Sequence, residues 1–79
     1  MPRYHIEVNC DSTVLEVTTV NSQMDAVALL AAYLVRGASL VERQSAQYRI
    51  AKELPVAIEA RGFACFECGA VTATVEPCN

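Results

Sequence analysis

Residues 3–20, RYHIEVNCDSTVLEVTTV, decide the fold class of this chain. Apolar and polar residues alternate on both sides of Asp11-Ser12, which is the pattern of a half-buried β-hairpin with a short turn. We therefore expect strands at residues 3–10 and 13–20, joined by a two-residue turn.

The alternation also predicts which residues share a face of this hairpin. With a two-residue turn, Ile6 lies opposite Val17 and Glu7 lies opposite Glu16. The expected core face consists of Tyr4, Ile6, Val8, Leu15 and Val17. The expected exposed face consists of Arg3, His5, Glu7, Asn9, Glu16 and Thr18, with Val14 and Val20 as its apolar members. Two carboxylates opposite each other repel, and the nearby Arg3 and His5 are expected to compensate for that repulsion.

The next segment, residues 21–37, NSQMDAVALLAAYLVRG, predicts a helix. Ser22 and Asp25 have the spacing of a capping box, and Gly37 is suited to end the helix. The helix is apolar almost all round from residue 26 to residue 35, so more than one of its sides must be covered. We expect it to lie between the sheet and a second helix; a homodimer formed through this apolar helix is the alternative.

A second capping box, Ser39 and Glu42, opens the segment SLVERQSAQYRIAKEL. Its expected apolar stripe consists of Val41, Tyr48, Ala51, Leu54 and Ile58. Proline lacks an amide proton, so we expect Pro55 to end this helix and to open a short third helix over residues 55–61, with Gly62 as its stop.

The carboxyl-terminal segment, residues 63–76, FACFECGAVTATVE, reads as a second hairpin that turns at Cys68-Gly69. Its expected core face consists of Ala64, Phe66, Val71, Ala73 and Val75. Its wetter face consists of Phe63, Cys65, Glu67, Thr72, Thr74 and Glu76. The whole chain is thus predicted to be a single α+β domain, residues 1–79, in the order ββααββ. Its antiparallel sheet is built from two hairpins, and its helices pack on one face.

Charge and hydropathy narrow the classes of function. The net charge is −3, and five of the six basic residues lie between residues 36 and 61, so both ends of the chain are acidic. A nucleic-acid-binding protein needs a basic patch, so no direct contact with nucleic acid is expected. The longest apolar stretch is residues 26–35, about half of a membrane span, and MPRYHIEVNC lacks the apolar core of a signal peptide. We expect a cytoplasmic protein that does not enter membranes.

An acidic face is the first candidate site. If the outward glutamates of both hairpins share one open sheet face, that face would attract a partner protein with a basic surface. Its negative charges could then occupy the positions that the phosphates of a nucleic acid would take on that partner. The candidate partner-binding residues are His5, Glu7, Asp11, Glu16, Glu67 and Glu76.

The spacing Cys65-x-x-Cys68-Gly69 is the second candidate, because two thiolates at this spacing can approach one zinc ion. A structural zinc site takes four ligands, and the other candidates are Cys78, Cys10 and His5. Free thiols, with no metal and no cofactor, are the preferred interpretation. A small zinc-binding adaptor is kept as the alternative. Cys10 can approach Cys68 only if the two hairpin turns are neighbours.

Catalysis is not expected from this sequence. His5 is the single histidine, it lies on an exposed strand face, and no nucleophile with an orienting group accompanies it. The three glycines are isolated, so no phosphate-binding loop is present.

In size, acidity and architecture, carried by YHIEVNCDSTVLEVTTVNSQMDAVALLAAYL, the chain resembles the small inhibitory proteins of phages and mobile elements, among them anti-CRISPR proteins. The resemblance implies a non-catalytic inhibitor in the host cell cytoplasm. It would bind a nucleic-acid-binding CRISPR effector complex through its acidic surface and block the binding of target DNA. An accessory subunit of a larger assembly, held by the apolar helix, is a further alternative.

Overall fold

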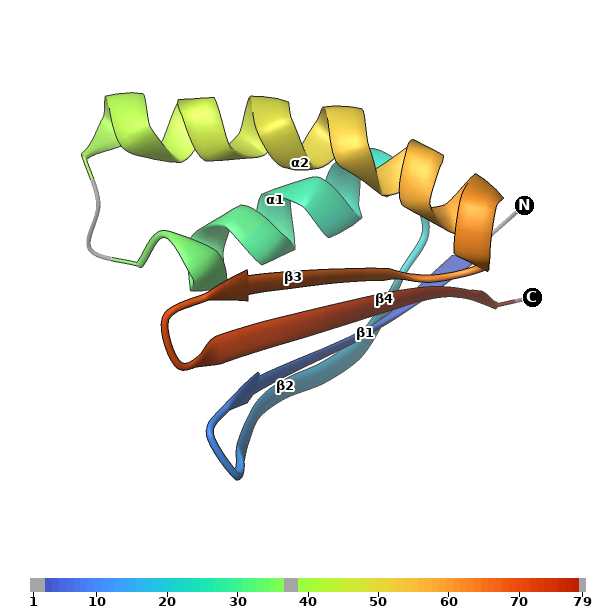
Figure 1. The fold of residues 1–79 in the computed structure, drawn as a ribbon, viewed down its shortest axis with the longest axis horizontal. Helices are drawn as coiled ribbons and strands as arrows, with labels where there is room; N and C mark the ends of the chain where they lie inside the picture. The colour runs from blue at the N-terminus through green and yellow to red at the C-terminus, as the bar shows by residue number, and fades with distance from the viewer. Residues whose placement is uncertain (1–2, 37–38, 79) are drawn as a thin grey trace.

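The two predicted hairpins form one four-stranded antiparallel sheet (Figure 1). The structure is a computed structural model that describes residues 3–36 and 39–78. The strands are β1 (Arg3–Cys10), β2 (Thr13–Val20), β3 (Ala64–Cys68) and β4 (Val71–Cys78). Their order across the sheet is β2-β1-β4-β3, so the first and the last strand of the chain pair at its centre.

Both helices, α1 (Gln23–Leu34) and α2 (Leu40–Arg61), lie on the same face of this sheet (Figure 1). α1 packs against β1, β2 and β4 and also against α2, while α2 packs against α1 and β3. The order ββααββ and the α+β fold class are therefore confirmed. The apolar α1 is covered on one side by the sheet and on another by α2.

Side-chain caps define where the helices begin. The Ser22 hydroxyl accepts a hydrogen bond from the Asp25 amide at 3.1 Å, and the Ser39 hydroxyl accepts one from the Glu42 amide at 3.2 Å. α1 ends at Leu34, and the predicted stop Gly37 lies outside the described residues. Gly62 ends α2 in the left-handed conformation, with φ of 83°, which glycine adopts without the steric cost of a Cβ atom.

The predicted break at Pro55 is wrong, because α2 is one continuous helix from residue 40 to residue 61. Proline removes the hydrogen bond to the carbonyl of Ala51, but both residues are exposed, so water can reach that carbonyl. Leu54 before the proline is buried, and Ile58 after it is partly buried against the core, so packing anchors the helix on both sides. Tertiary contacts thus hold the two predicted helices as one.

The buried face of α2 also differs from the predicted stripe. Ala46, Ile50 and Leu54 are its buried residues, at a spacing of four, whereas Val41 and Tyr48 are each 74% exposed. The apolar residues on this exposed side of α2 remain without a covering element among the described residues.

A β-bulge in the first hairpin changes its register. The pairing is Cys10 with Thr13 next to the turn, but beyond the bulge Val8 pairs with Glu16 and Glu7 pairs with Val17. The predicted pairing of Glu7 with Glu16 is therefore wrong. Because one extra residue is inserted in β2, every β2 residue beyond it lies on the face opposite to the predicted one. Val17, expected in the core, is 55% exposed.

The faces of the second hairpin are as predicted, although its turn is one residue later, at Gly69-Ala70. Ala64, Ala73 and Val75 are fully buried. The two hairpin turns are neighbours at one end of the sheet, where the Asp11 amide donates a hydrogen bond of 3.1 Å to the Ala70 carbonyl.

A single apolar core lies between the sheet and the helices. Its largest fully buried side chains are those of Ile6, Leu30, Ile50, Leu54, Val8 and Val75. Within residues 3–36 and 39–78, no helix is both long enough and apolar enough to cross a membrane.

Candidate functional site

The face of the sheet that lies away from α1 and α2 carries no other element of the described chain. We call it the open face. Strand alternation and the observed register assign its residues. They are Arg3, His5, Glu7, Asn9, Val14, Val17, Thr19, Cys65, Glu67, Thr72, Thr74, Glu76 and Cys78.

Four of the six predicted partner-binding residues lie on the open face. His5 on β1 pairs directly with Glu76 on β4. Glu7 lies between Val17 and Thr74, and Glu67 pairs with Thr72. Glu67 and Glu76 are exposed, while His5 and Glu7 are half-buried among their strand neighbours.

Glu16 is not on this face. The bulge turns it toward the helices, where the Tyr33 hydroxyl of α1 donates a hydrogen bond of 3.2 Å to its Oε2 atom. Burial, followed by this hydrogen bond and the Glu16 charge, raises the pKa of Tyr33 above its usual value of 10.0. Glu16 therefore ties β2 to α1 and is not available to a partner on the open face.

Asp11 is also outside the open face, at the tip of the first hairpin. It has a φ of 55°, a left-handed conformation that aspartate tolerates better than most residues. Its side chain is exposed beside the second turn, so it can extend an acidic contact only at that end of the molecule.

The register lowers the repulsion expected on the open face and leaves its charge negative. Glu7 has a valine and a threonine as its direct cross-strand neighbours, so the expected glutamate pair does not form. Glu7, Glu67 and Glu76 against Arg3, with His5 neutral, give three negative charges and one positive charge, a net of −2. Acidity thus persists on this face without Glu16.

The sequence pattern correctly places Val14 on the exposed face but wrongly places Val17 in the core; both lie on the open face, and each is 55% exposed. The signal that could have identified Val17 is the adjacent pair Val14-Leu15, where two apolar residues in succession interrupt the alternation. Such an interruption is what a bulge produces, because two residues of one strand oppose a single residue of the other. The two valines add apolar contact area beside the acidic residues.

The cysteines do not converge. Cys65 and Cys68 both lie within β3, three residues apart, so their side chains point to opposite faces with Cα atoms about 10 Å apart. Cys10 and Cys68 share the helix-covered face at the turn end, but Val71 of β4 lies between them. Groups of three or more metal-binding side chains are absent among residues 3–36 and 39–78. A zinc ion held by both Cys65 and Cys68 would require β3 to open.

One thiol lies close to the histidine. Cys78 pairs with Arg3, which places it diagonal to His5 on the open face, at a Cα separation of about 7–8 Å. Glu76 is directly opposite His5. The three residues lie on an uncovered sheet surface, and Glu76 is exposed. This arrangement provides side chains for surface contacts, without the enclosure that excludes water around a reacting group.

Comparisons of the chain with protein-family models, with curated proteins and with solved structures found no match. The proposed function therefore rests on the residues and charges of the open face.

Proposed function

We propose that this chain is a non-catalytic protein-binding inhibitor that uses the open face of its sheet to hold a partner with a basic surface. The observation that carries the proposal is the presence of Glu7, Glu67 and Glu76 on one uncovered sheet face with a net charge of −2. A rigid acidic surface attracts a basic partner at long range and fixes its orientation on contact. The exposed Val14 and Val17 supply apolar area for the same contact.

The particular form of this function follows from the resemblance to anti-CRISPR proteins. In that form the protein acts in the cytoplasm of the host cell and binds a CRISPR effector complex. The carboxylates occupy part of the basic channel that would otherwise hold nucleic acid. Such an inhibitor acts by occupancy, so its effect reaches a plateau at one molecule per binding site and requires no turnover.

The test is a competition experiment with purified CRISPR effector complexes and labelled target DNA. We expect the wild-type protein to reduce DNA binding in an electrophoretic mobility assay. The triple variant Glu7→Lys, Glu67→Lys and Glu76→Lys should lose at least about tenfold in affinity for the complex, because reversed charges oppose a basic surface. The loss should shrink as salt is raised, since exposed charges are screened.

Glu59→Lys is the matched control for the single variants Glu7→Lys, Glu67→Lys and Glu76→Lys, because Glu59 is an exposed residue of α2 and its replacement makes the same single charge reversal away from the open face. Circular dichroism should show that all variants remain folded. Wild-type protein that leaves DNA binding unchanged in every complex tested would refute the anti-CRISPR form. A triple variant that inhibits as well as Glu59→Lys would refute the role of the acidic face.

The zinc-binding adaptor remains a separate hypothesis with its own measurement. Metal analysis of the purified protein should find less than about a tenth of an equivalent of zinc, because Cys65 and Cys68 face opposite sides of β3 and a structural site needs four converging ligands. A full equivalent of bound zinc would show that the carboxyl-terminal hairpin rearranges around the metal and would favour the adaptor.

A further inference from the structure

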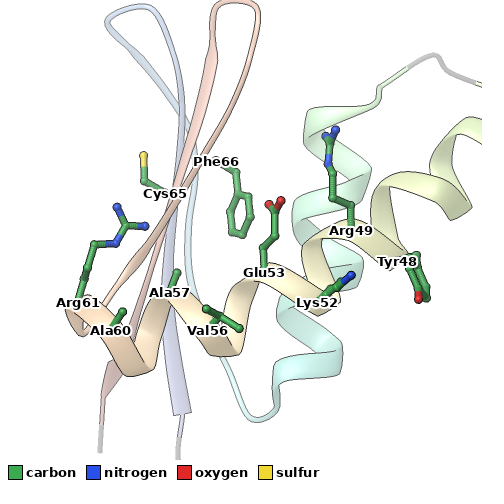
Figure 2. Close-up of a pocket in the computed structure, with 10 residues that line it drawn as sticks. All are labelled: Tyr48, Arg49, Lys52, Glu53, Val56, Ala57, Ala60, Arg61, Cys65 and Phe66. Carbon is green, nitrogen blue, oxygen red and sulfur yellow. The ribbon is translucent and has the colours of Figure 1, made fainter.

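A groove of about 700 Å³ lies between α2 and β3, at the edge of the sheet that β3 forms (Figure 2). Val56, Ala57 and Ala60 of α2 form one wall, and Phe66 of β3 points into the groove from the other. Val56 is 66% exposed although it is a large apolar residue, so this wall is open to water. The groove is therefore largely apolar and unfilled by any described part of the chain.

The free edge of β3 borders this groove. Cys68 pairs with Val71 across a two-residue turn, so Cys68, Phe66 and Ala64 exchange their main-chain hydrogen bonds with β4. The amides and carbonyls of Cys65 and Glu67 then point away from β4, because alternate residues of an antiparallel strand face opposite edges. Two donors and two acceptors are thus presented at the edge of the sheet, next to an apolar wall.

The other edge of the sheet, β2, differs from β3. β2 carries the bulge opposite Val8 and Asn9, and a bulge disrupts the regular spacing that another strand needs for pairing. β3 has a regular register over its whole length and contains neither proline nor lysine, two residues that protect edge strands. Of the two edges, only β3 combines regular unpaired main-chain groups with an adjoining apolar groove.

The charges around the groove are mainly positive. Arg49, Lys52 and Arg61 line it together with one acidic residue, Glu53. Arg61 lies at one end of the groove, near Cys65, and Arg49 and Lys52 lie toward the other end (Figure 2). This distribution is opposite in sign to the open face, so the two surfaces suit different partners.

We propose that β3 and α2 form a docking groove for an extended segment of a partner protein, which adds to the sheet as a fifth strand. Main-chain hydrogen bonds to Cys65 and Glu67 hold the segment, and every second side chain enters the groove, so these side chains are apolar. Acidic residues at the two ends of the segment meet Arg61 and the pair Arg49 and Lys52. The occupant is therefore an extended acidic and apolar peptide.

A labelled synthetic peptide of matching chemistry tests this groove. The probe is fluorescein-Glu-Val-Thr-Val-Thr-Val-Thr-Glu, and its binding is followed by fluorescence anisotropy and by nuclear magnetic resonance shifts of the protein amides. We expect saturable binding, with the largest shifts in β3 and in the second half of α2. Replacing both terminal glutamates of the probe by lysine should weaken binding at least about tenfold.

Backbone methylation of the probe separates strand addition from simple apolar contact. One probe is N-methylated at its valines and another at its threonines, so that each loses one of the two alternating sets of amide donors. One of the two should lose binding at least about tenfold and the other should keep it, because only one edge of an added strand pairs with β3. Equal behaviour of the two methylated probes would overturn strand addition.

Variants of the protein test whether the peptide binds at the edge of β3 and the α2 wall of the groove. Glu67→Pro removes an outward amide without touching the pairing with β4, and proline is tolerated at such edge positions. Val56→Asp places a negative charge on the groove wall, and Val41→Asp is its matched control, an exposed valine of α2 outside the groove. We expect Glu67→Pro and Val56→Asp to weaken binding at least about tenfold and Val41→Asp to leave it unchanged.

Three further results would refute the proposal. One is no binding of the unmethylated probe. Another is equal loss of binding in Val56→Asp and Val41→Asp. The third is a dimer in sedimentation experiments that Val56→Asp dissociates, since a second copy of the chain would then occupy the groove. None of these results depends on the open face, so failure here leaves the proposed function untouched.

Discussion

Replacing Leu30 by alanine measures how strongly α1 is held between the sheet and α2. Leu30 is fully buried and is among the largest such side chains in the core. Its loss removes three carbon atoms and leaves a cavity, at a general cost of about 2–5 kcal/mol. Several of the other core residues are alanines, among them Ala26, Ala31 and Ala73, which are too short to fill the space. We therefore expect the upper part of that range, about 3–5 kcal/mol.

This loss is large for a chain of this length. Domains have free energies of unfolding of about 0.05–0.15 kcal/mol per residue, which gives about 4–12 kcal/mol here. The melting temperature of Leu30→Ala should fall by at least about 12 °C, since each kcal/mol corresponds to about 4–8 °C in a domain of this size. Urea and thermal unfolding followed by circular dichroism provide the measurement.

Met24→Ala is the matched control. It lies in the same helix and also loses three heavy atoms, but Met24 is 75% exposed, so its replacement should change stability by no more than about 0.5 kcal/mol. Both variants and the wild type are compared at two protein concentrations. A cost of less than about 1 kcal/mol for Leu30→Ala would refute the packing argument. A melting temperature that rises with protein concentration, together with a large effect of Met24→Ala, would instead place α1 in a homodimer interface.

Three further predictions concern single features. Gly62→Ala should destabilise the protein by about 1–2 kcal/mol, because its φ of 83° is costly for a residue with a Cβ atom, and a urea midpoint equal to that of the wild type would contradict this. The raised pKa of Tyr33 adds stability that is complete below pH 10.0 and is lost as the pH rises through the higher folded-state value. Tyr33→Phe, which lacks this ionisation and the bond to Glu16, should therefore show a shallower loss of stability at alkaline pH; parallel curves would argue against it. Mild oxidation of the native protein should not join Cys65 to Cys68, since their Cα atoms are about 10 Å apart and a disulfide spans less than about 7 Å. Mass spectrometry of proteolytic fragments would detect such a bond.

Much of the fold was predictable because its signals are local. The alternation of residues 3–20 gave both strands at the bounds that the structure has. Ser22 and Ser39 marked where the helices begin, and Gly62 marked where α2 ends, since each of these residues satisfies a main-chain group that the helix itself leaves unpaired.

The errors arose where distant contacts override local preference. Pro55 is unfavourable within a helix, yet Leu54 and Ile58 are held by the core, and this packing keeps α2 continuous. The buried stripe of α2 depends on which neighbours cover it. The predicted stripe included Tyr48 and omitted Ile50, whereas Tyr48 is exposed and Ile50 is buried.

The sequence predicted the candidate site only in part: residues that follow regular alternation were placed correctly, and the residue beyond the bulge was not. His5, Glu7, Glu67 and Glu76 follow strict alternation and share the open face. Glu16 was assigned to the wrong face because a bulge inserts one extra residue, which reverses the face of every residue beyond it. Strict alternation does not reveal where such an extra residue is inserted. The β3 groove could not be predicted at all, because it depends on the angle between a helix and a strand edge.

The pairing of the first strand with the last has a consequence for how the chain acquires its structure. Each hairpin closes a short loop and can form within microseconds, but neither buries a core alone. The contact between β1 and β4 spans almost the whole sequence, so loop closure must precede any gain from it. During synthesis, β1 keeps an unpaired edge until residues 71–78 have left the ribosome. Glu7 lies in the middle of that edge strand, and its negative charge opposes the edge-to-edge pairing of two nascent copies, because like charges repel.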